Sequence, residues 1–212
     1  MKNNNGYAVI ILTLLLAVGL GVWWYTATQK APEPTPVVTT PVVVPLHADW
    51  KTYSSTEYGF QIKYSEDYVA KAALPDDPQK KIVRFDYTDP RKGGTAMDSI
   101  TVRAVPWGMG QAANWQNIIM NDVVFDGSGA HPQAFTEFTE RKIGNKTFYS
   151  IKTGRFEGIL AFTYYSVSEK YGILAFDARA EGVDWTNPNL DEENDSVHKT
   201  LRTMLETFNY ND

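Results

Sequence analysis

The sequence predicts an α+β fold: an antiparallel β-sheet with helices packed on its faces, preceded by a single transmembrane helix. Three observations support this class. Segments after residue 50 alternate apolar and polar residues with the period of two that half-buried strands show. Two other segments carry apolar stripes with the 3.6-residue period of a helix. Finally, an uncharged apolar stretch, residues 7–25, lies near the N-terminus.

After a short N-terminal tail (1–6), residues 7–25 are predicted to form a transmembrane anchor. At about 1.5 Å per residue the helix is about 28 Å long, close to the roughly 30 Å hydrocarbon thickness of a bilayer. The alternative is a cleaved signal peptide, whose apolar region would be about 7 to 15 residues and would precede small residues. Here the stretch ends in the bulky rings of residues 23–25 (WWY), which suit an interfacial aromatic belt.

The charges that flank the anchor predict its orientation. Lys2 and the free amino terminus lie on one side of it, and Lys30 lies on the other, with Glu33 just beyond. The positive-inside rule then favours a cytoplasmic N-terminus. The sequence therefore predicts a single-pass protein of the cell membrane with an extracytoplasmic C-terminal domain.

Residues 26–49 are predicted to form a proline-rich linker. Proline at this density blocks helices and sheet ladders, and it favours extended polyproline II at about 3.1 Å per residue. The prolines are Pro32, Pro34, Pro36, Pro41 and Pro45. A disordered spacer without a preferred reach is the alternative. Either way, residues 50–210 are expected to form a separate domain away from the membrane.

Composition excludes several classes of function. The chain has no cysteine, which excludes disulfides, thiolate zinc sites, iron–sulfur clusters and thiol nucleophiles. Beyond residue 45 there are 24 acidic residues (25 less Glu33) and 18 basic ones (20 less Lys2 and Lys30), a net charge of −6. This balance is unlike that of a nucleic-acid-binding or anionic-lipid-binding surface, so no nucleic-acid partner is expected.

The strands are expected to pair as hairpins. Residues 81–105 form one with a long polar tip, and residues 134–143 and 147–153 flank the turn Gly144-Asn145, whose residues tolerate positive φ. Residues 159–167 are apolar on both faces and need cover above and below. A similar strand follows them across a turn at 168–172.

Two helices are expected to supply the cover. Residues 111–122 place Trp115, Ile118 and Ile119 on one stripe, and residues 191–208 carry the other. The second stripe consists of Val197, Leu201, Met204, Leu205 and Phe208. Asn189 and Glu192 have the spacing of a capping box at the start of this helix.

Taken in order, these features resemble a known family. The domain opens with an aromatic hairpin around Tyr58-Gly59-Phe60, an aromatic follows near Tyr68, and a Gly-Asn turn, a two-sided aromatic strand pair and a helix ending on Phe208 come after. The order is similar to that of PsbP-like domains with the Mog1/PsbP fold, particularly the membrane-anchored bacterial type. The resemblance covers residues 50–210 and departs at Tyr64-Ser65, where such domains commonly have Tyr-Pro. It implies an α/β/α sandwich and a non-enzymatic accessory or binding module.

Few residues suggest catalysis or metal binding. His131 shares a glycine-rich loop with Asp126 and Ser128, a weak candidate metal or hydrolytic cluster, although such residues are usual in loops. His198 is expected at the margin of the last helix's stripe, with its ring reaching water. The acidic loop 184–195 lacks the glycine and glutamate positions of an EF-hand, and helix capping explains it more simply. Phosphate loops, G-x-S-x-G and H-E-x-x-H are absent, so neither enzymatic activity nor a bound cofactor or metal is expected.

The aromatic residues of the first hairpin divide into core and surface. Phe60 and Tyr64 share a face with an isoleucine and are expected in the core. Trp50, Tyr53 and Tyr68 are the candidates for surface contact with a partner. The expected function is that of a membrane-tethered extracytoplasmic module that binds a protein or other envelope partner. A metal-assisted hydrolase using the 126–131 loop and a structural subunit of an envelope complex are the alternatives.

Overall fold

The computed structural model describes residues 47, 49–73, 77, 80–88, 97–107, 114–125, 129–156 and 158–211. The predicted tail and anchor, and all of the predicted linker except His47 and Asp49, lie outside these residues and stay predictions. Within the described ranges, no helix combines the length and the hydropathy needed to cross a bilayer.

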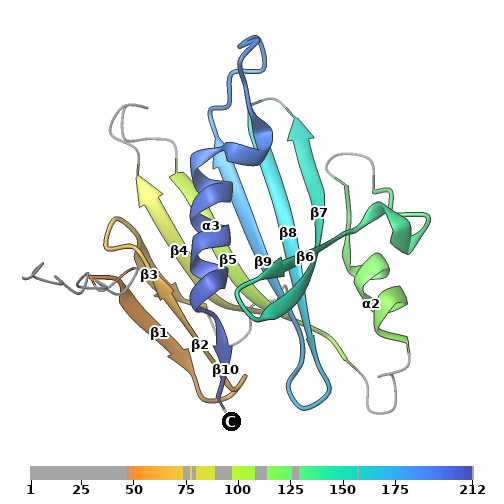
Figure 1. Ribbon diagram of the computed structural model, residues 1–212. Coiled ribbons are helices and arrows are strands. Elements are labelled where there is room, and N and C mark those ends of the chain that lie inside the picture. Colours follow the sequence, from red (N-terminus) through yellow and green to blue (C-terminus); the bar gives the residue numbers. More distant parts are fainter. Residues whose placement is uncertain are drawn as a thin grey trace, which may run out of the picture. The chain divides into compact units, whose positions relative to one another are not determined.

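The described residues form two antiparallel sheets (Figure 1). The larger has the order β3-β4-β5-β9-β8-β7-β6 and the smaller the order β1-β2-β10. The strands of the larger sheet are β3 (Val69–Ala72), β4 (Lys81–Thr88), β5 (Met97–Val105), β6 (Thr139–Ile143), β7 (Lys146–Phe156), β8 (Ile159–Ser168) and β9 (Gly172–Glu181). Those of the smaller sheet are β1 (Lys51–Ser55), β2 (Phe60–Tyr64) and β10 (Asn209–Tyr210). The predicted antiparallel, sheet-rich α+β class is thereby confirmed.

The hairpins predicted from alternation are present. β4 pairs with β5, β6 with β7, and β8 with β9, all antiparallel. One predicted boundary was wrong, because residues 134–138 do not belong to β6. A 3₁₀ turn, η3 (Phe135–Glu137), forms there instead, and the Glu137 carboxylate accepts hydrogen bonds from the backbone N–H groups of Gln133 and Ala134 at 2.6 and 3.1 Å.

Two α-helices, α2 (Trp115–Asp122) and α3 (Ser196–Thr207), accompany the sheets in the described residues. The capping box expected at Asn189 and Glu192 was wrong. The chain first makes a 3₁₀ turn, η4 (Glu192–Asn194), and α3 then begins after Asp195, whose Oδ1 accepts from the N–H groups of Val197 and His198 at 2.9 and 3.4 Å. An aspartate at this position accepts hydrogen bonds from N–H groups that have no partner within the helix, and its negative charge interacts favourably with the positive end of the helix dipole.

The two helices cover opposite faces of the larger sheet. The neighbours Tyr164 and Tyr165 point to opposite faces of β8, and both are fully buried. Tyr164 belongs to the core under α3, while Tyr165 belongs to a second core with Ile119 of α2. Figure 1 shows α3 running along the front of this sheet. The prediction that this strand needs cover on both faces is therefore confirmed.

The Tyr58-Gly59-Phe60 motif closes one end of the first core. Phe60 is fully buried against Phe208, with ring centroids 5.9 Å apart. Gly59 has a φ of +59°, and a Cβ there would lie within 3.0 Å of the Tyr171 ring. That ring stacks on Tyr210 with centroids 5.1 Å apart. Glycine is thus required twice, by its backbone conformation and by the ring that lies against it.

Candidate functional site

The sheet face opposite α3 is apolar at one end and polar at the other. At the apolar end, Val105 and Ile173 pair across β5 and β9 and pack with Ile119 and Val123 near α2. An eight-residue helix is only about 12 Å long, too short to cover the whole face. The strand register places a polar row across the other end, with one residue from each of β4, β5, β9 and β8: Arg84, Thr101, Asp177 and Thr163.

Over this polar end lies an open cavity of about 730 Å³, which we call the sheet groove. Its size falls within the roughly 300–1,000 Å³ of ordinary ligand sites. Ser99, Thr101, Ala161 and Thr163 line it with small side chains, which leaves the face hollow. The exposed Pro106 and Val124 also line it, together with charged side chains: Lys80, Lys81, Arg84, Arg103, Asp122, Asp177, Arg179 and Glu181.

Arg103 is the centre of a hydrogen-bonded network in the sheet groove. Its Nη1 and Nη2 donate to the two carboxylate oxygens of Asp122 at 2.7 and 2.6 Å, and its Nε donates to Asp177 Oδ2 at 2.8 Å. Tyr165 Oη donates to Asp122 Oδ2 at 2.7 Å, and Thr163 Oγ1 donates to Asp177 Oδ1 at 2.7 Å. Because Asp122 is the last residue of α2, this network joins the helix to the centre of the sheet.

The same network fixes the protonation of its members. Burial disfavours the charge of Arg103, but Asp177 and Asp122 outweigh it, so the pKa of Arg103 is raised. Burial, reinforced by the Asp122 charge, raises the pKa of Tyr165 well above its ordinary value. Arg103 therefore stays charged and Tyr165 stays neutral at physiological pH. Neither residue is therefore suited to exchange protons near neutral pH.

The cations at the rim of the sheet groove have weaker partners. Arg84 Nε lies 2.5 Å from Asp86 Oδ1, and Arg179 Nε lies 3.1 Å from Glu181 Oε1, each pair within one strand. The Arg84 and Arg179 side chains are 43% and 46% exposed. The Arg179–Glu181 pair is exposed on both sides, and such pairs contribute only about 0.2–1 kcal/mol, so this guanidinium group can exchange one carboxylate partner for another. Asp86, in contrast, is 6% exposed and also lies 2.8 Å from Lys71 Nζ, so it stays in place beside Arg84.

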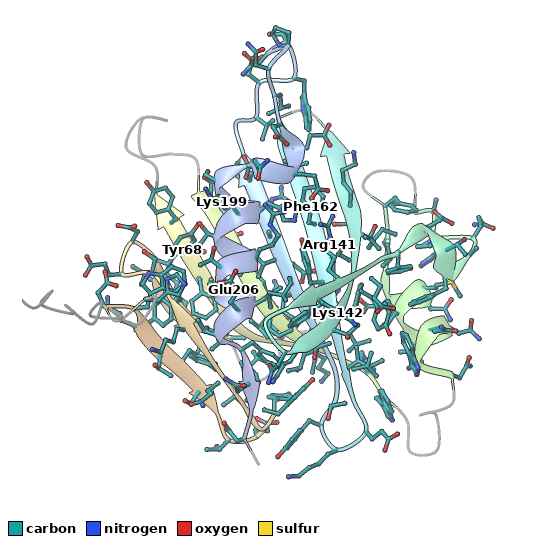
Figure 2. The ribbon with its side chains drawn as sticks, in the orientation of Figure 1. Tyr68, Arg141, Lys142, Phe162, Lys199 and Glu206 are labelled. Carbon is teal, nitrogen blue, oxygen red and sulfur yellow. The ribbon has the colours of Figure 1, made fainter. Side chains whose placement is uncertain are left out.

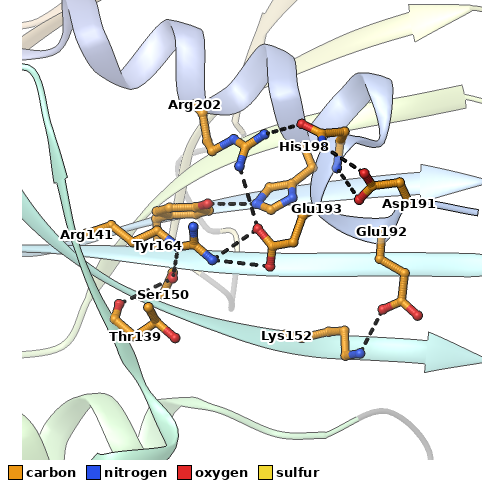
Figure 3. A network of polar contacts seen from close by, with 11 residues as sticks. Thr139, Arg141, Ser150, Lys152, Tyr164, Asp191, Glu192, Glu193, His198 and Arg202 are labelled. Carbon is orange, nitrogen blue, oxygen red and sulfur yellow. Dashed lines mark hydrogen bonds and ion pairs between the residues drawn. The ribbon is translucent and has the colours of Figure 1, made fainter.

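A second polar network lies on the α3 side of the sheet (Figure 3). Arg141 donates to both carboxylate oxygens of Glu193 at 3.2 and 3.0 Å, and Lys152 Nζ lies 2.7 Å from Glu192 Oε2. Arg202 lies 3.6 Å from Glu193. These pairs hold the η4 turn against β6 and β7 and border a smaller cavity of about 390 Å³.

His198 lies behind this second network. Its Nε2 is 2.7 Å from Tyr164 Oη, and its ring stacks on Phe162 with centroids 3.7 Å apart. The residue is only 1% exposed, so the expectation that its ring reaches water was wrong. Burial lowers its pKa, and the nearby cations Arg202 and Arg141 act in the same direction, while Glu193 opposes them. His198 is thus a buried neutral residue of the core.

The three aromatic candidates for surface contact pack against the first core. Tyr68 is 5% exposed beside α3 (Figure 2), with its ring 5.4 Å from that of Tyr87, so it presents no surface and that expectation is corrected. Trp50 and Tyr53 are both partly buried against this core. Tyr53 packs edge-on against Phe85, with centroids 6.0 Å apart. Partner contact at Trp50 and Tyr53 stays a prediction.

The 126–131 candidate cluster falls mostly outside the described residues. His131 is exposed, whereas Asp126 and Ser128 are not described, so the hydrolase alternative stays an untested prediction. Within the described ranges, no three histidine or acidic residues lie close enough to hold a metal ion. In the loop 184–195, Asp191 Oδ1 accepts from Asn194 N at 3.2 Å and caps η4, whereas Asp184 Oδ1 accepts from Thr186 N at 2.9 Å in a turn of the loop, so helix capping explains only part of this loop.

The residues that line the sheet groove were not predicted as a site. The period of two of a strand places Asp177 and Arg179 on one face of β9, and it places Arg103 on the face of β5 opposite the buried Val102. It did not say which strands are neighbours. Arg103 and Asp177 are 74 positions apart, and only the pairing of β5 with β9 brings them together.

Comparison with known proteins gives only distant likenesses among solved structures. No protein family matches the chain, and no curated protein does. Among solved structures, the chain is similar to the solution structure of cyanobacterial PsbP (CyanoP) from Synechocystis sp. PCC 6803, with a TM-score of 0.44 and 16% identity over 76% of this chain and 92% of that one. A likeness at this level does not assign a function.

Proposed function

We propose that the protein is a non-enzymatic accessory module of the PsbP-like type, tethered to the cell membrane, which binds an envelope partner outside the cytoplasm through the sheet groove. The observation that carries this proposal is the half-covered sheet face. α2 buries the apolar end, whereas the polar end around Arg103 stays open to a cavity of about 730 Å³.

The chemistry of the sheet groove favours binding over catalysis. Arg103 and Tyr165 are each held in one protonation state, and Asp122 and Asp177 are occupied by hydrogen bonds to them. A general acid or base needs a pKa near the working pH. A rigid network that presents fixed charges and hydroxyls instead suits recognition, because its groups are already oriented before a partner arrives.

Photo-crosslinking in native membranes tests the proposal. A photoreactive amino acid is placed at Val124 or Arg179, both exposed at the sheet groove, in the full-length chain. Matched controls carry it at Lys142 and Lys199, which are exposed on β6 and α3 and lie outside the groove (Figure 2). We expect a discrete adduct from the groove positions only. Adducts of equal yield from all four positions, or none from the groove, contradict the proposal.

The tethered topology has its own test. Protease added to intact cells should release residues 50–210, because the proline-rich linker is expected to lie outside the membrane. A domain that is cleaved only after the cells are lysed contradicts the extracytoplasmic placement.

A further inference from the structure

The sheet groove is cationic on an acidic protein. Its lining holds five cationic side chains and three carboxylates, a net charge of +2, whereas the chain beyond residue 45 carries −6. The cations are Lys80, Lys81, Arg84, Arg103 and Arg179, and the acids are Asp122, Asp177 and Glu181. Complementary charge sets partner choice and association rate, so the expected ligand is acidic.

The cations are spread along the sheet groove and do not meet at one point. Arg84 lies on β4 and Arg179 on β9, with β5 between them, so the two are roughly 9–10 Å apart across the strands and a further two residues, roughly 7 Å, apart along them. Lys80 lies near the other end, where its carbonyl accepts a hydrogen bond from Ala104 N at 3.0 Å. A single small anion cannot contact all three. In an extended peptide, alternate side chains on one face are about 7 Å apart, which suits cations spaced in this way.

An apolar patch borders the same cavity. Val124 is 53% exposed, and Val69 is the other large hydrophobic residue among the described ones that is comparably exposed. Val124 and the exposed Pro106 both line the sheet groove, after α2 and β5 respectively. An inorganic anion gains nothing from such a patch, whereas a peptide can bury an apolar side chain there.

We propose that the sheet groove binds an acidic, extended peptide segment of a partner protein. Its carboxylates lie between Lys80, Arg84 and Arg179, above the hydroxyls of Ser99 and Thr101, and an apolar side chain packs on the Val124–Pro106 patch. The proposal rests on the proposed function and adds the chemical class of the partner. The exposed Glu181 carboxylate is the contact of Arg179 that a ligand carboxylate replaces, whereas the half-exposed Arg84 keeps the buried Asp86 and shares its free face with the ligand.

Fluorescence anisotropy tests the proposal with the full-length chain in nanodiscs of neutral phosphatidylcholine. The probe is a fluorescein-labelled peptide of alternating glutamate and serine that ends in valine. We expect saturable binding that weakens as salt is raised, and a loss of about tenfold or more in affinity for Lys80→Glu/Arg179→Glu. The control with the same change in charge, Lys142→Glu/Lys199→Glu, should stay within about twofold of wild type, since a charge beyond a Debye length is screened.

Folding and competing ligands are controlled separately. Near-ultraviolet circular dichroism checks each variant, and Lys80→Gln/Arg179→Gln replaces the charge reversal should that variant unfold.

Equal losses of peptide affinity in the groove and control variants overturn the proposal. Displacement of the peptide by inorganic phosphate, added at the same total concentration of negative charge, also overturns it, because this result indicates a site for small anions. Binding to phosphatidylglycerol vesicles without binding to the peptide overturns it as well. Should groove crosslinks form in membranes while the peptide does not bind, the acidic-peptide proposal fails and the proposed function stands. Should no groove crosslinks form, the proposed function fails.

Discussion

Replacing Gly59 by alanine should destabilise the fold far more than the same change at another glycine of similar backbone conformation. Gly59 and Gly129 have φ values of +59° and +65°, so each replacement costs roughly 1–2 kcal/mol for a Cβ in the left-handed region. At Gly129 the added Cβ meets no described atom within 4 Å, whereas at Gly59 it meets the Tyr171 ring.

The extra cost at Gly59 comes from displacing that ring. Tyr171 must leave its stack on Tyr210, worth about 0.5–1.5 kcal/mol, and the hydrogen bond that its hydroxyl donates to the Asn211 carbonyl, worth about 1 kcal/mol. We therefore expect Gly59→Ala to lower the free energy of unfolding by about 3–4 kcal/mol and Gly129→Ala by about 1–2 kcal/mol.

A double-mutant cycle isolates the collision between the two side chains. In a Tyr171→Ala background, Gly59→Ala should cost only the backbone contribution of about 1–2 kcal/mol, because the ring is gone. The assay is urea unfolding of the full-length chain in mild detergent, followed by tryptophan fluorescence. Equal costs for Gly59→Ala in the two backgrounds would refute the reasoning, since the ring would then play no part.

Three further predictions concern the helices and networks. Because the pKa of His198 is lowered in the folded state, the unfolded chain takes up this proton first as pH falls. The stability that His198 contributes is therefore complete above about pH 6.5 and is lost below it, by up to roughly 1.4 kcal/mol per pH unit. Measured by urea unfolding at a series of pH values, His198→Gln should flatten this slope. Asp195→Ala should cost about 1 kcal/mol in urea unfolding by removing the α3 cap, and Asp195→Asn should restore most of it; equal losses would argue against capping. Arg103→Met should lower the free energy of unfolding by about 3 kcal/mol in thermal unfolding, because two largely shielded carboxylates lose their partner. Adding Asp122→Asn to this variant should recover part of the loss. No loss in Arg103→Met would show that the network contributes nothing to stability.

The sequence predicted the individual strands and helices better than it predicted which strands lie next to each other in the sheet. Alternation identified the strands because one-sided burial repeats every two residues, and the two-sided β8 was clear because residues 159–167 carry apolar side chains on both faces. Helix ends were less certain, since several acidic and amide residues near Asp195 have capping chemistry and only the three-dimensional path selects one. The sheet groove depends on the pairing of β5 with β9, which no local pattern specifies.

The aromatic hairpin shows the same limit. Six rings between residues 50 and 68 suggested both core and contact roles, and alternation correctly assigned Phe60 to the core. Tyr68 was misplaced because its burial depends on α3, which is more than a hundred positions away in sequence. The polar positions of β4, β5, β8 and β9 form the candidate site because α2 is too short to cover them, and no local pattern shows how long that helix is or where it lies.

Hydrogen–deuterium exchange of the full-length chain in native membrane extracts, compared with the purified chain, tests most directly that the sheet groove is the binding face. With the partner present, the account predicts slower exchange in the segments that carry the groove, residues 97–107 and 159–168 and the end of α2, and unchanged exchange in α3. Slower exchange confined to α3 and η4, with residues 97–107 unchanged, would contradict it and place the partner on the opposite face of the sheet.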